Sequence, residues 1–223
     1  MVATQGTRKR LCPMDIQFII WALEISPRQQ DHFLSLLVDP ETIDQILDDP
    51  RLLDKILGEP RNLYLSPELY FYLLLRRAFQ DAGHQNPDLP EYAAGVLAEY
   101  SRKNPLRKPF EEIDSDLSYT VEIFAAMDTA DAYRRFTLYI FAGNQFLFLT
   151  GLFSDYLNAR TNRKGAPDIQ YYEEFGKSSY QAAGEHPLAQ EFDVKNMCHS
   201  LAVNFTLTRQ VLQDVSDRLM FLD

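Results

Sequence analysis

Apolar residues recur at helical spacing along most of the chain, and strict alternation of apolar and polar residues is nowhere sustained. The clearest run is at the end of the sequence, where one face continues for about four heptads: Val194, Met197, Leu201, Phe205, Thr208, Leu212, Val215, Leu219 and Leu222. This spacing predicts one long C-terminal helix. The expected fold is all-α, a multi-helix bundle in which that helix packs on a buried central helix.

The central helix is predicted from Phe141–Phe153, which reads FAGNQFLFLTGLF. Charged residues limit the apolar run to Phe136–Phe153, which is short for a membrane span of about 20 residues. The amides of Asn144 and Gln145 near its middle would be costly in lipid. The pattern therefore favours a buried helix in a core, with Gly143 and Gly151 letting another helix approach closely.

Several helix starts are visible as an N-cap residue followed by proline, at Asp39-Pro40, Asp49-Pro50 and Ser66-Pro67. Residues 1–62 are expected to form an N-terminal region of short helices and 63–223 the main bundle, with a single continuous domain as the alternative. Further on, Leu69–Leu75 is apolar at every position, which predicts either deep packing or an interface.

The chain has 223 residues and a formal net charge of −10, which argues against a general polyanion binder and against docking on an anionic membrane. Its two cysteines, Cys12 and Cys198, form no regular framework, as is typical of a reducing compartment. No secretory signal pattern is visible at the start. A cytoplasmic protein is expected.

Tests for catalytic motifs are negative. The sequence has no Glu-x-x-His pair and no His-Glu-x-x-His pair. It also has no complete phosphate loop of the form Gly-x-x-x-x-Gly-Lys-Ser/Thr and no Gly-x-Ser-x-Gly elbow. The four histidines suit loop or core roles, and His199 has no carboxylate at helical spacing to orient it. We expect no metal and no cofactor, and the balance leans against an enzyme.

A basic turn follows the central segment and supplies the first candidate site. Arg160, Arg163 and Lys164 stand within five positions, and Asp168 can cap the helix that follows. Such a turn could hold a phosphate or carboxylate. The alternative, which we favour, is that these charges compensate helix dipoles and pair with one another.

Polar residues on the apolar helices supply the rest of that site. Asn144 and Tyr172 either satisfy buried partners or form the polar end of an apolar pocket. The pocket interpretation gives a ligand-binding set for a small anionic or aromatic molecule, with a cavity of about 300 Å³ or more between the central and final helices. The set comprises Asn144, Arg160, Arg163, Lys164 and Tyr172.

Four stretches together resemble a family of uncharacterised bacterial proteins. They are GNQFLFLTGLF (143–153), RTNRKGAP (160–167), YYEEFG (171–176) and SDRLMF (216–221). The similarity runs from about Leu69, through EYAAGVLAEY, to the C-terminus. It implies membership of that family and no activity, substrate or cofactor.

Three classes of function follow. The first is a non-catalytic protein that acts through protein contacts and self-association, as a homodimer that buries Leu69–Leu75 and the long C-terminal face. The alternative is a small-molecule-binding protein or enzyme with an apolar inter-helical pocket. Nucleic-acid binding ranks last, because only two basic loops support it, 102–108 and 160–164.

Overall fold

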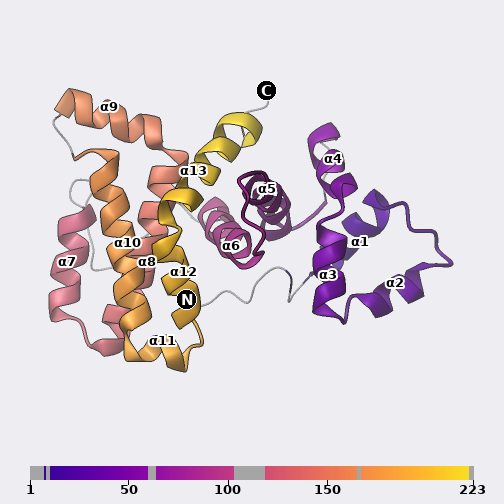
Figure 1. Cartoon of the computed structure of the whole chain (residues 1–223), viewed down its shortest axis with the longest axis horizontal. Coiled ribbons are helices and arrows are strands. Elements are labelled where there is room, and N and C mark those ends of the chain that lie inside the picture. Colours follow the sequence, from indigo (N-terminus) through magenta and orange to yellow (C-terminus); the bar gives the residue numbers. More distant parts are fainter. Residues whose placement is uncertain (1–7, 9–10, 60–63, 103–118, 165–166, 221–223) are drawn as a thin grey trace. The chain divides into compact units, whose positions relative to one another are not determined.

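The computed structural model describes residues 8, 11–59, 64–102, 119–164 and 167–220, with the backbone alone at 119–122, 124, 164, 219 and 220. These residues form thirteen α-helices and no strand, which confirms the predicted all-α fold. The helices belong to two compact units (Figure 1). Of the described residues, those between 8 and 102 and those from 217 to 220 belong to the N-terminal unit, and those between 119 and 216 belong to the C-terminal unit. The described part of the predicted region 1–62 therefore shares a unit with the two helices that follow it.

Short helices start the N-terminal unit, and their caps are those that the sequence predicts. Asp39, Asp49 and Ser66 each accept a hydrogen bond from a backbone N–H of the first helical turn. In each helix proline occupies the first turn, where its missing N–H costs nothing. The helices of the unit are α1 (Pro13–Ala22), α2 (Gln30–Leu36), α3 (Pro40–Leu47), α4 (Pro50–Gly58), α5 (Pro67–Asp81) and α6 (Asp88–Arg102).

The starts of α1 and α5 are joined through one buried carboxylate. Asp15, only 1% exposed, accepts hydrogen bonds from the backbone N–H of Cys12 at 3.0 Å and of Ser66 at 2.7 Å. It also accepts one from the Ser66 hydroxyl at 3.0 Å, and that hydroxyl accepts from the N–H of Leu69. This chain of bonds fixes where the two helices meet.

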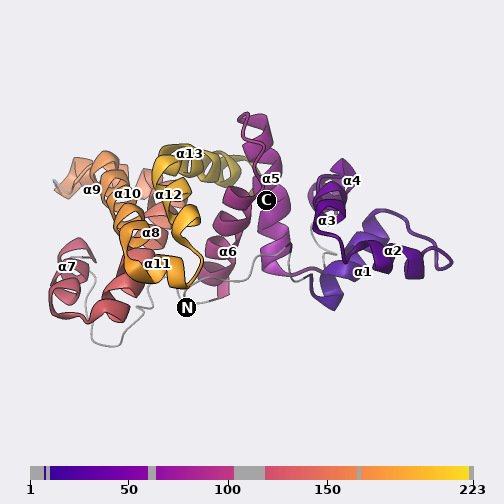
Figure 2. The ribbon, with the colours of Figure 1, turned by 60° about the horizontal axis from the view of Figure 1, so that its bottom comes forward.

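Helix α5 is buried almost all round. It packs along α6 (Figure 2), and Leu69, Phe71, Tyr72 and Leu73–Leu75 are all buried within this single chain. Of the two alternatives for this run, deep packing is the one observed. Within the run, Tyr70 alone is partly exposed.

The C-terminal unit is built around α8, which confirms the predicted buried central helix. It contains eleven buried residues and packs against α10 and α13. Its N-cap is Asp131, and the carbonyls that end the preceding helix accept hydrogen bonds from Arg135. The helices of the unit are α7 (Tyr119–Thr129), α8 (Ala132–Leu152), α9 (Ser154–Lys164), α10 (Ile169–Glu185), α11 (Pro187–Glu191), α12 (Lys195–Val203) and α13 (Phe205–Val215).

Glycines bring these helices close together, as the sequence predicts for Gly143 and Gly151. A Cβ atom added at Gly143 would lie 2.6 Å from the ring of Tyr180 on α10. One added at Gly151 would lie 2.7 Å from the Cβ of Leu212 on α13. The large side chain from one helix thus fills the space that the glycine of the other leaves.

The prediction of one long C-terminal helix is wrong. The segment forms α12 and α13, which meet at Asn204, and then a π-helical turn at Ser216–Met220. The Asn204 side chain donates to the carbonyl of Ser200, and Thr208 donates to the carbonyl of Asn204, the kind of local bond that bends helices. The break lets α12 pack on α10 while α13 packs on α8.

Within the described residues, no single helix is long and apolar enough to cross a membrane. Helices α8 and α9 pass that test of length and composition only as a pair, and the two are bent by 86° where they meet.

Candidate functional site

Asn144 has a structural partner inside the C-terminal unit. The hydroxyl of Tyr180 donates to its Oδ1 at 2.8 Å, and Tyr180 is fully buried between α8 and α10. A buried tyrosine needs one such partner for its hydroxyl. The bond supports the reading in which Asn144 satisfies a buried group.

Arg160 and Tyr172 lie close together where α9 and α10 meet. Burial raises the pKa of the Tyr172 phenol, and the positive charge of Arg160 opposes that shift. The Tyr172 ring stacks on Phe146 at 5.8 Å, while the Arg160 guanidinium lies 5.9 Å from the ring centre of Tyr156. Tyr180 follows Tyr172 by eight residues, or about 12 Å along α10, so these contacts and the Asn144 bond are separate features.

The other two predicted residues end α9. Arg163 is exposed, and Lys164 is the last residue of the helix, with a side chain outside the described part of the structure. Asp168 caps α10 as predicted, accepting from the N–H of Tyr171 at 2.9 Å. Of the other basic loop, 102–108, only Arg102 is described, and its guanidinium pairs with Glu68.

A groove of about 420 Å³ opens on the C-terminal unit between α7, α8 and α10. Its walls are mainly aromatic or apolar, with Met127, Tyr139, Tyr171 and Phe175, and its polar residues include Glu174. None of its lining residues belongs to α12 or α13. The groove thus lies elsewhere than the cavity expected between the central and final helices, and its charged wall is acidic.

The N-terminal unit carries a groove of the same volume, which we call the aromatic groove. Its lining residues are Gln17, Phe18, Trp21, Glu59 and Tyr64. Trp21 is 42% exposed and Tyr64 79% exposed, although both are large aromatic residues. The ammonium group of Lys55 lies 4.6 Å from the centre of the Trp21 ring.

Charges of both signs border the aromatic groove. A neighbouring hollow of about 350 Å³ shares Glu59 with it and is also lined by Glu24, Arg51, Asp54 and Lys55. Three acids and two bases thus stand beside the exposed aromatic rings. A surface of this composition can face a copy of itself with opposite charges opposed.

A third feature of the N-terminal unit is an arginine enclosed by acids. All three nitrogens of the Arg8 guanidinium donate to carboxylates: Nη1 to Asp44 at 2.8 Å, Nη2 to Asp88 at 2.6 Å, and Nε to Glu91 at 3.1 Å. The backbone N–H of Arg8 donates to Glu91 as well, at 2.9 Å. We call Asp44, Asp88 and Glu91 the acidic cradle.

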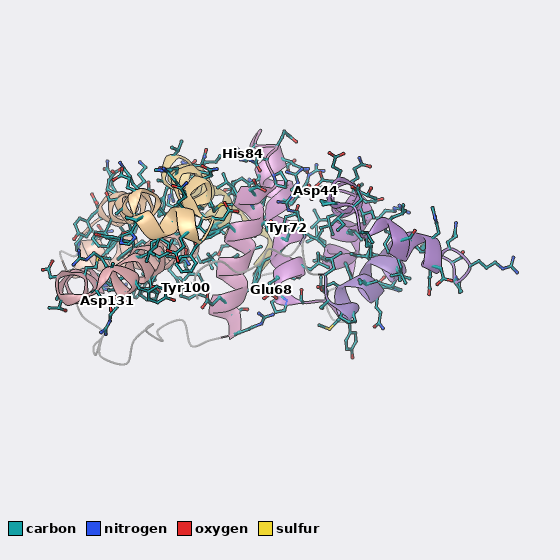
Figure 3. The ribbon with its side chains drawn as sticks, turned by 90° about the horizontal axis from the view of Figure 1, so that it is seen from below. Asp44, Glu68, Tyr72, His84, Tyr100 and Asp131 are labelled. Carbon is teal, nitrogen blue, oxygen red and sulfur yellow. The ribbon has the colours of Figure 1, made fainter. Side chains whose placement is uncertain are left out.

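A second arginine and a buried phenol lie beside the acidic cradle. Arg76 donates to both carboxylate oxygens of Asp48 at 2.7 Å and to the carbonyl of Gln85 at 2.5 Å. Tyr72, one turn before Arg76 on α5, is fully buried. Its hydroxyl has no hydrogen-bond partner among the residues that the structure describes. Figure 3 labels Tyr72, which belongs to α5, and Asp44, which belongs to α3.

The ionisation of this cluster follows from its charges. Burial alone would lower the pKa of Arg8, but the hydrogen bonds and charges of Glu91 and Asp44 outweigh that effect and raise it. Burial also raises the pKa of Tyr72, on which the charges of Arg8, Arg76, Asp44 and Asp48 all act. Arg8 therefore keeps its charge and Tyr72 its proton at neutral pH.

Sequence reasoning missed the whole cluster. The available signal was the i, i+4 spacing of Asp44 with Asp48 and of Tyr72 with Arg76, which places each pair on one face of its helix. No three His, Cys, Asp or Glu side chains in the described parts of the chain are grouped so that they could hold a metal ion.

Comparisons of the chain with protein-family models, with curated proteins and with solved structures give no match. The resemblance to a family of uncharacterised bacterial proteins stays a prediction.

Proposed function

We propose that the protein is a non-catalytic cytoplasmic protein that acts by self-association, and that the aromatic groove of the N-terminal unit is its contact surface. The observation that carries this proposal is the exposure of Trp21 and Tyr64, which both line one groove. Tryptophan and tyrosine are enriched among the residues that dominate binding energy at protein interfaces. A monomer gains nothing from leaving them in water.

The surrounding residues favour a second copy of the chain as the partner. A twofold interface brings the same patch of both subunits together, so the patch must be self-complementary. The mixed charges of Glu24, Arg51, Asp54, Lys55 and Glu59 meet that condition despite the net charge of −10. Other large apolar side chains of α1, α2 and α4 are also partly exposed: Met14, Leu34, Leu36 and Leu57.

Most of the surface first expected to form a dimer is buried inside the chain, while the side chains of Leu219 and Leu222 lie outside the described part of the structure. Leu69–Leu75 is buried along α5 apart from Tyr70, and the apolar residues Leu201, Phe205 and Leu212 are fully buried in the C-terminal unit. The proposal therefore places self-association on the aromatic groove.

Sedimentation velocity from about 1 µM to about 100 µM tests the proposal, because weak homodimers dissociate within that range. The wild type is expected to shift from monomer to dimer as its concentration rises. Trp21 is the only tryptophan in the sequence, so its fluorescence should move to shorter wavelength over the same range.

Trp21→Ser should remain monomeric throughout. The matched control is Tyr156→Ser, which removes an aromatic residue that is 56% exposed on the C-terminal unit and should dimerise as the wild type does. A wild type that stays monomeric at every concentration overturns self-association. Equal dimerisation of Trp21→Ser overturns the choice of surface.

The groove between α7, α8 and α10 supports a second candidate, binding of a small aromatic molecule. Its volume of about 420 Å³ is in the range of ligand pockets, and Tyr139, Tyr171 and Phe175 line it. A neutral aromatic probe such as 1-naphthol should raise the melting temperature. Tyr171→Ala should abolish that rise and Trp21→Ser should leave it unchanged. If Trp21→Ser abolishes the rise and Tyr171→Ala does not, the probe binds in the aromatic groove and the second candidate function is wrong.

A further inference from the structure

The acidic cradle has the composition and geometry of a site for one kind of ligand. Three carboxylates from two helices converge on the planar head of Arg8, so that each guanidinium nitrogen faces an acceptor. A guanidinium holds its donors in a fixed fork, whereas an ammonium is a single point charge. The arrangement of acceptors around three sides of a plane therefore selects a guanidinium over an ammonium group.

The cradle is held in place by the helices that supply it. Asp44 belongs to α3, and Asp88 and Glu91 stand three residues apart in the first turn of α6. Glu91 is the most enclosed of the three, with a side chain only 11% exposed, and the Arg8 side chain is 16% exposed. Charge-assisted hydrogen bonds with this little water around them are stronger than those at the surface.

Two observations indicate that the cradle can do more than hold Arg8. Three acidic groups face the single positive charge of Arg8, which leaves the cradle with excess negative charge. The fully buried Tyr72 hydroxyl, on which the charges of Arg8 and Asp44 act, has no hydrogen-bond partner among the described residues. Its oxygen is therefore an unused acceptor among these charges.

We propose that the acidic cradle is a guanidinium-binding site which Arg8 fills from within the chain. An alkylguanidinium molecule in solution binds the same site when Arg8 is shortened, and it donates a hydrogen bond to Tyr72. In the intact protein Arg8 is the ligand, and its guanidinium connects α3 with α6.

Chemical rescue of Arg8→Ala tests the proposal. Thermal unfolding of this variant is followed with ethylguanidinium chloride, and with ethylammonium chloride at the same ionic strength, up to about ten times the expected millimolar Kd. Ethylguanidinium should raise the melting temperature of Arg8→Ala in a saturable way by about 3 °C. Ethylammonium should raise it much less, and neither compound should stabilise the wild type, whose cradle is already occupied.

Two further variants locate the binding. Adding Asp44→Asn to Arg8→Ala removes one wall of the cradle and should abolish the rescue. Adding Tyr72→Phe should weaken the affinity for ethylguanidinium about fivefold, the loss expected for one hydrogen bond. The Tyr156→Ser control in the Arg8→Ala background should change neither result.

The outcomes that overturn the proposal are equally specific. Equal stabilisation by the two cations, or a rescue that survives Asp44→Asn, shows that the cradle does not recognise the guanidinium group. If Arg8→Ala does not fold alone, folding restored by ethylguanidinium and not by ethylammonium supports the proposal, and failure of both overturns it. These results are independent of sedimentation, so the self-association proposal stands or falls separately.

Discussion

Each unit contains a fully buried tyrosine, but the hydrogen bonding of its hydroxyl differs between the two units. In the C-terminal unit, Tyr180 donates to Asn144, and its ring fills the space beside Gly143. In the N-terminal unit, Tyr72 is equally buried, and its hydroxyl lies among charges with no hydrogen-bond partner in the described structure. Burying a polar group without a partner costs free energy. The two buried hydroxyls therefore differ: that of Tyr180 is satisfied, whereas that of Tyr72 is an unused acceptor.

The largest difference between the units is expected in the reactivity of their cysteines. Cys198 is buried in the C-terminal unit, where burial raises the pKa of its thiol to about 12, so almost no thiolate is present at pH 8. Cys12 starts α1 in the N-terminal unit and is partly exposed. A chromogenic disulfide reagent should react with Cys12 at least about 100-fold faster than with Cys198.

Two measurements check this comparison of the thiols. Cys12→Ser should remove the fast phase, and full denaturation should make both thiols react. A fast phase of two thiols in the native protein would contradict the description of the C-terminal unit as a closed core.

The junction of α1 and α5 gives the next largest effect. Asp15→Ala should lower the free energy of unfolding by about 3 kcal/mol, because the N–H groups of Cys12 and Ser66 lose their buried acceptor. Urea denaturation measures the change. Asp31→Ala, at an exposed position on α2, is the control and should stay within about 0.5 kcal/mol of the wild type. A small effect of Asp15→Ala would mean that the two helix starts are held together by packing alone.

Close helix approach can be tested by adding one methyl group in each unit. A Cβ atom at Gly176 would lie 2.4 Å from the buried ring of Phe205, so Gly176→Ala should destabilise the protein by about 2 kcal/mol. A Cβ atom at Gly58 on α4 would meet no atom within 4 Å, so Gly58→Ala should be neutral or stabilise it by up to about 1 kcal/mol. Urea denaturation of both variants gives the comparison, and equal effects would contradict it.

The smallest effects concern the two tyrosine hydroxyls themselves. Tyr180→Phe should cost about 1 kcal/mol, because it removes the bond to Asn144. Tyr72→Phe should change the free energy of unfolding by less than about 0.5 kcal/mol or increase it, because the lost hydroxyl has no partner to leave behind. Calorimetry measures the stability of both variants. An equal loss of stability in Tyr72→Phe and Tyr180→Phe would show that a bound water or ligand satisfies the Tyr72 hydroxyl.

The sequence was sufficient for features that depend on neighbouring residues. The caps at Asp39, Asp49, Ser66 and Asp168 are local signals, and each opens a helix as predicted. The break at Asn204 was missed because the apolar spacing continues across it, and only packing on two different helices shows that the axis changes.

The acidic cradle was beyond sequence reasoning for a different reason. Arg8 is separated from Asp44, Asp88 and Glu91 by 36, 80 and 83 positions. Each of these residues taken alone looks like an ordinary surface charge on an acidic protein. Of the predicted ligand residues, the structure brings Arg160 close to Tyr172 and gives Asn144 a partner in Tyr180, which the sequence allowed as one of two alternatives.

The glycine contacts of the C-terminal unit have one more consequence. Gly143 receives Tyr180, Gly151 receives Leu212 and Gly176 receives Phe205, so three matched pairs connect α8, α10 and α13. Sliding one helix along another by a single turn, about 5.4 Å, would set each large side chain against a residue that carries its own Cβ. The three pairs therefore fit only one axial alignment of the helices and exclude the alignments one turn away. Movement within this unit must then carry the three helices together.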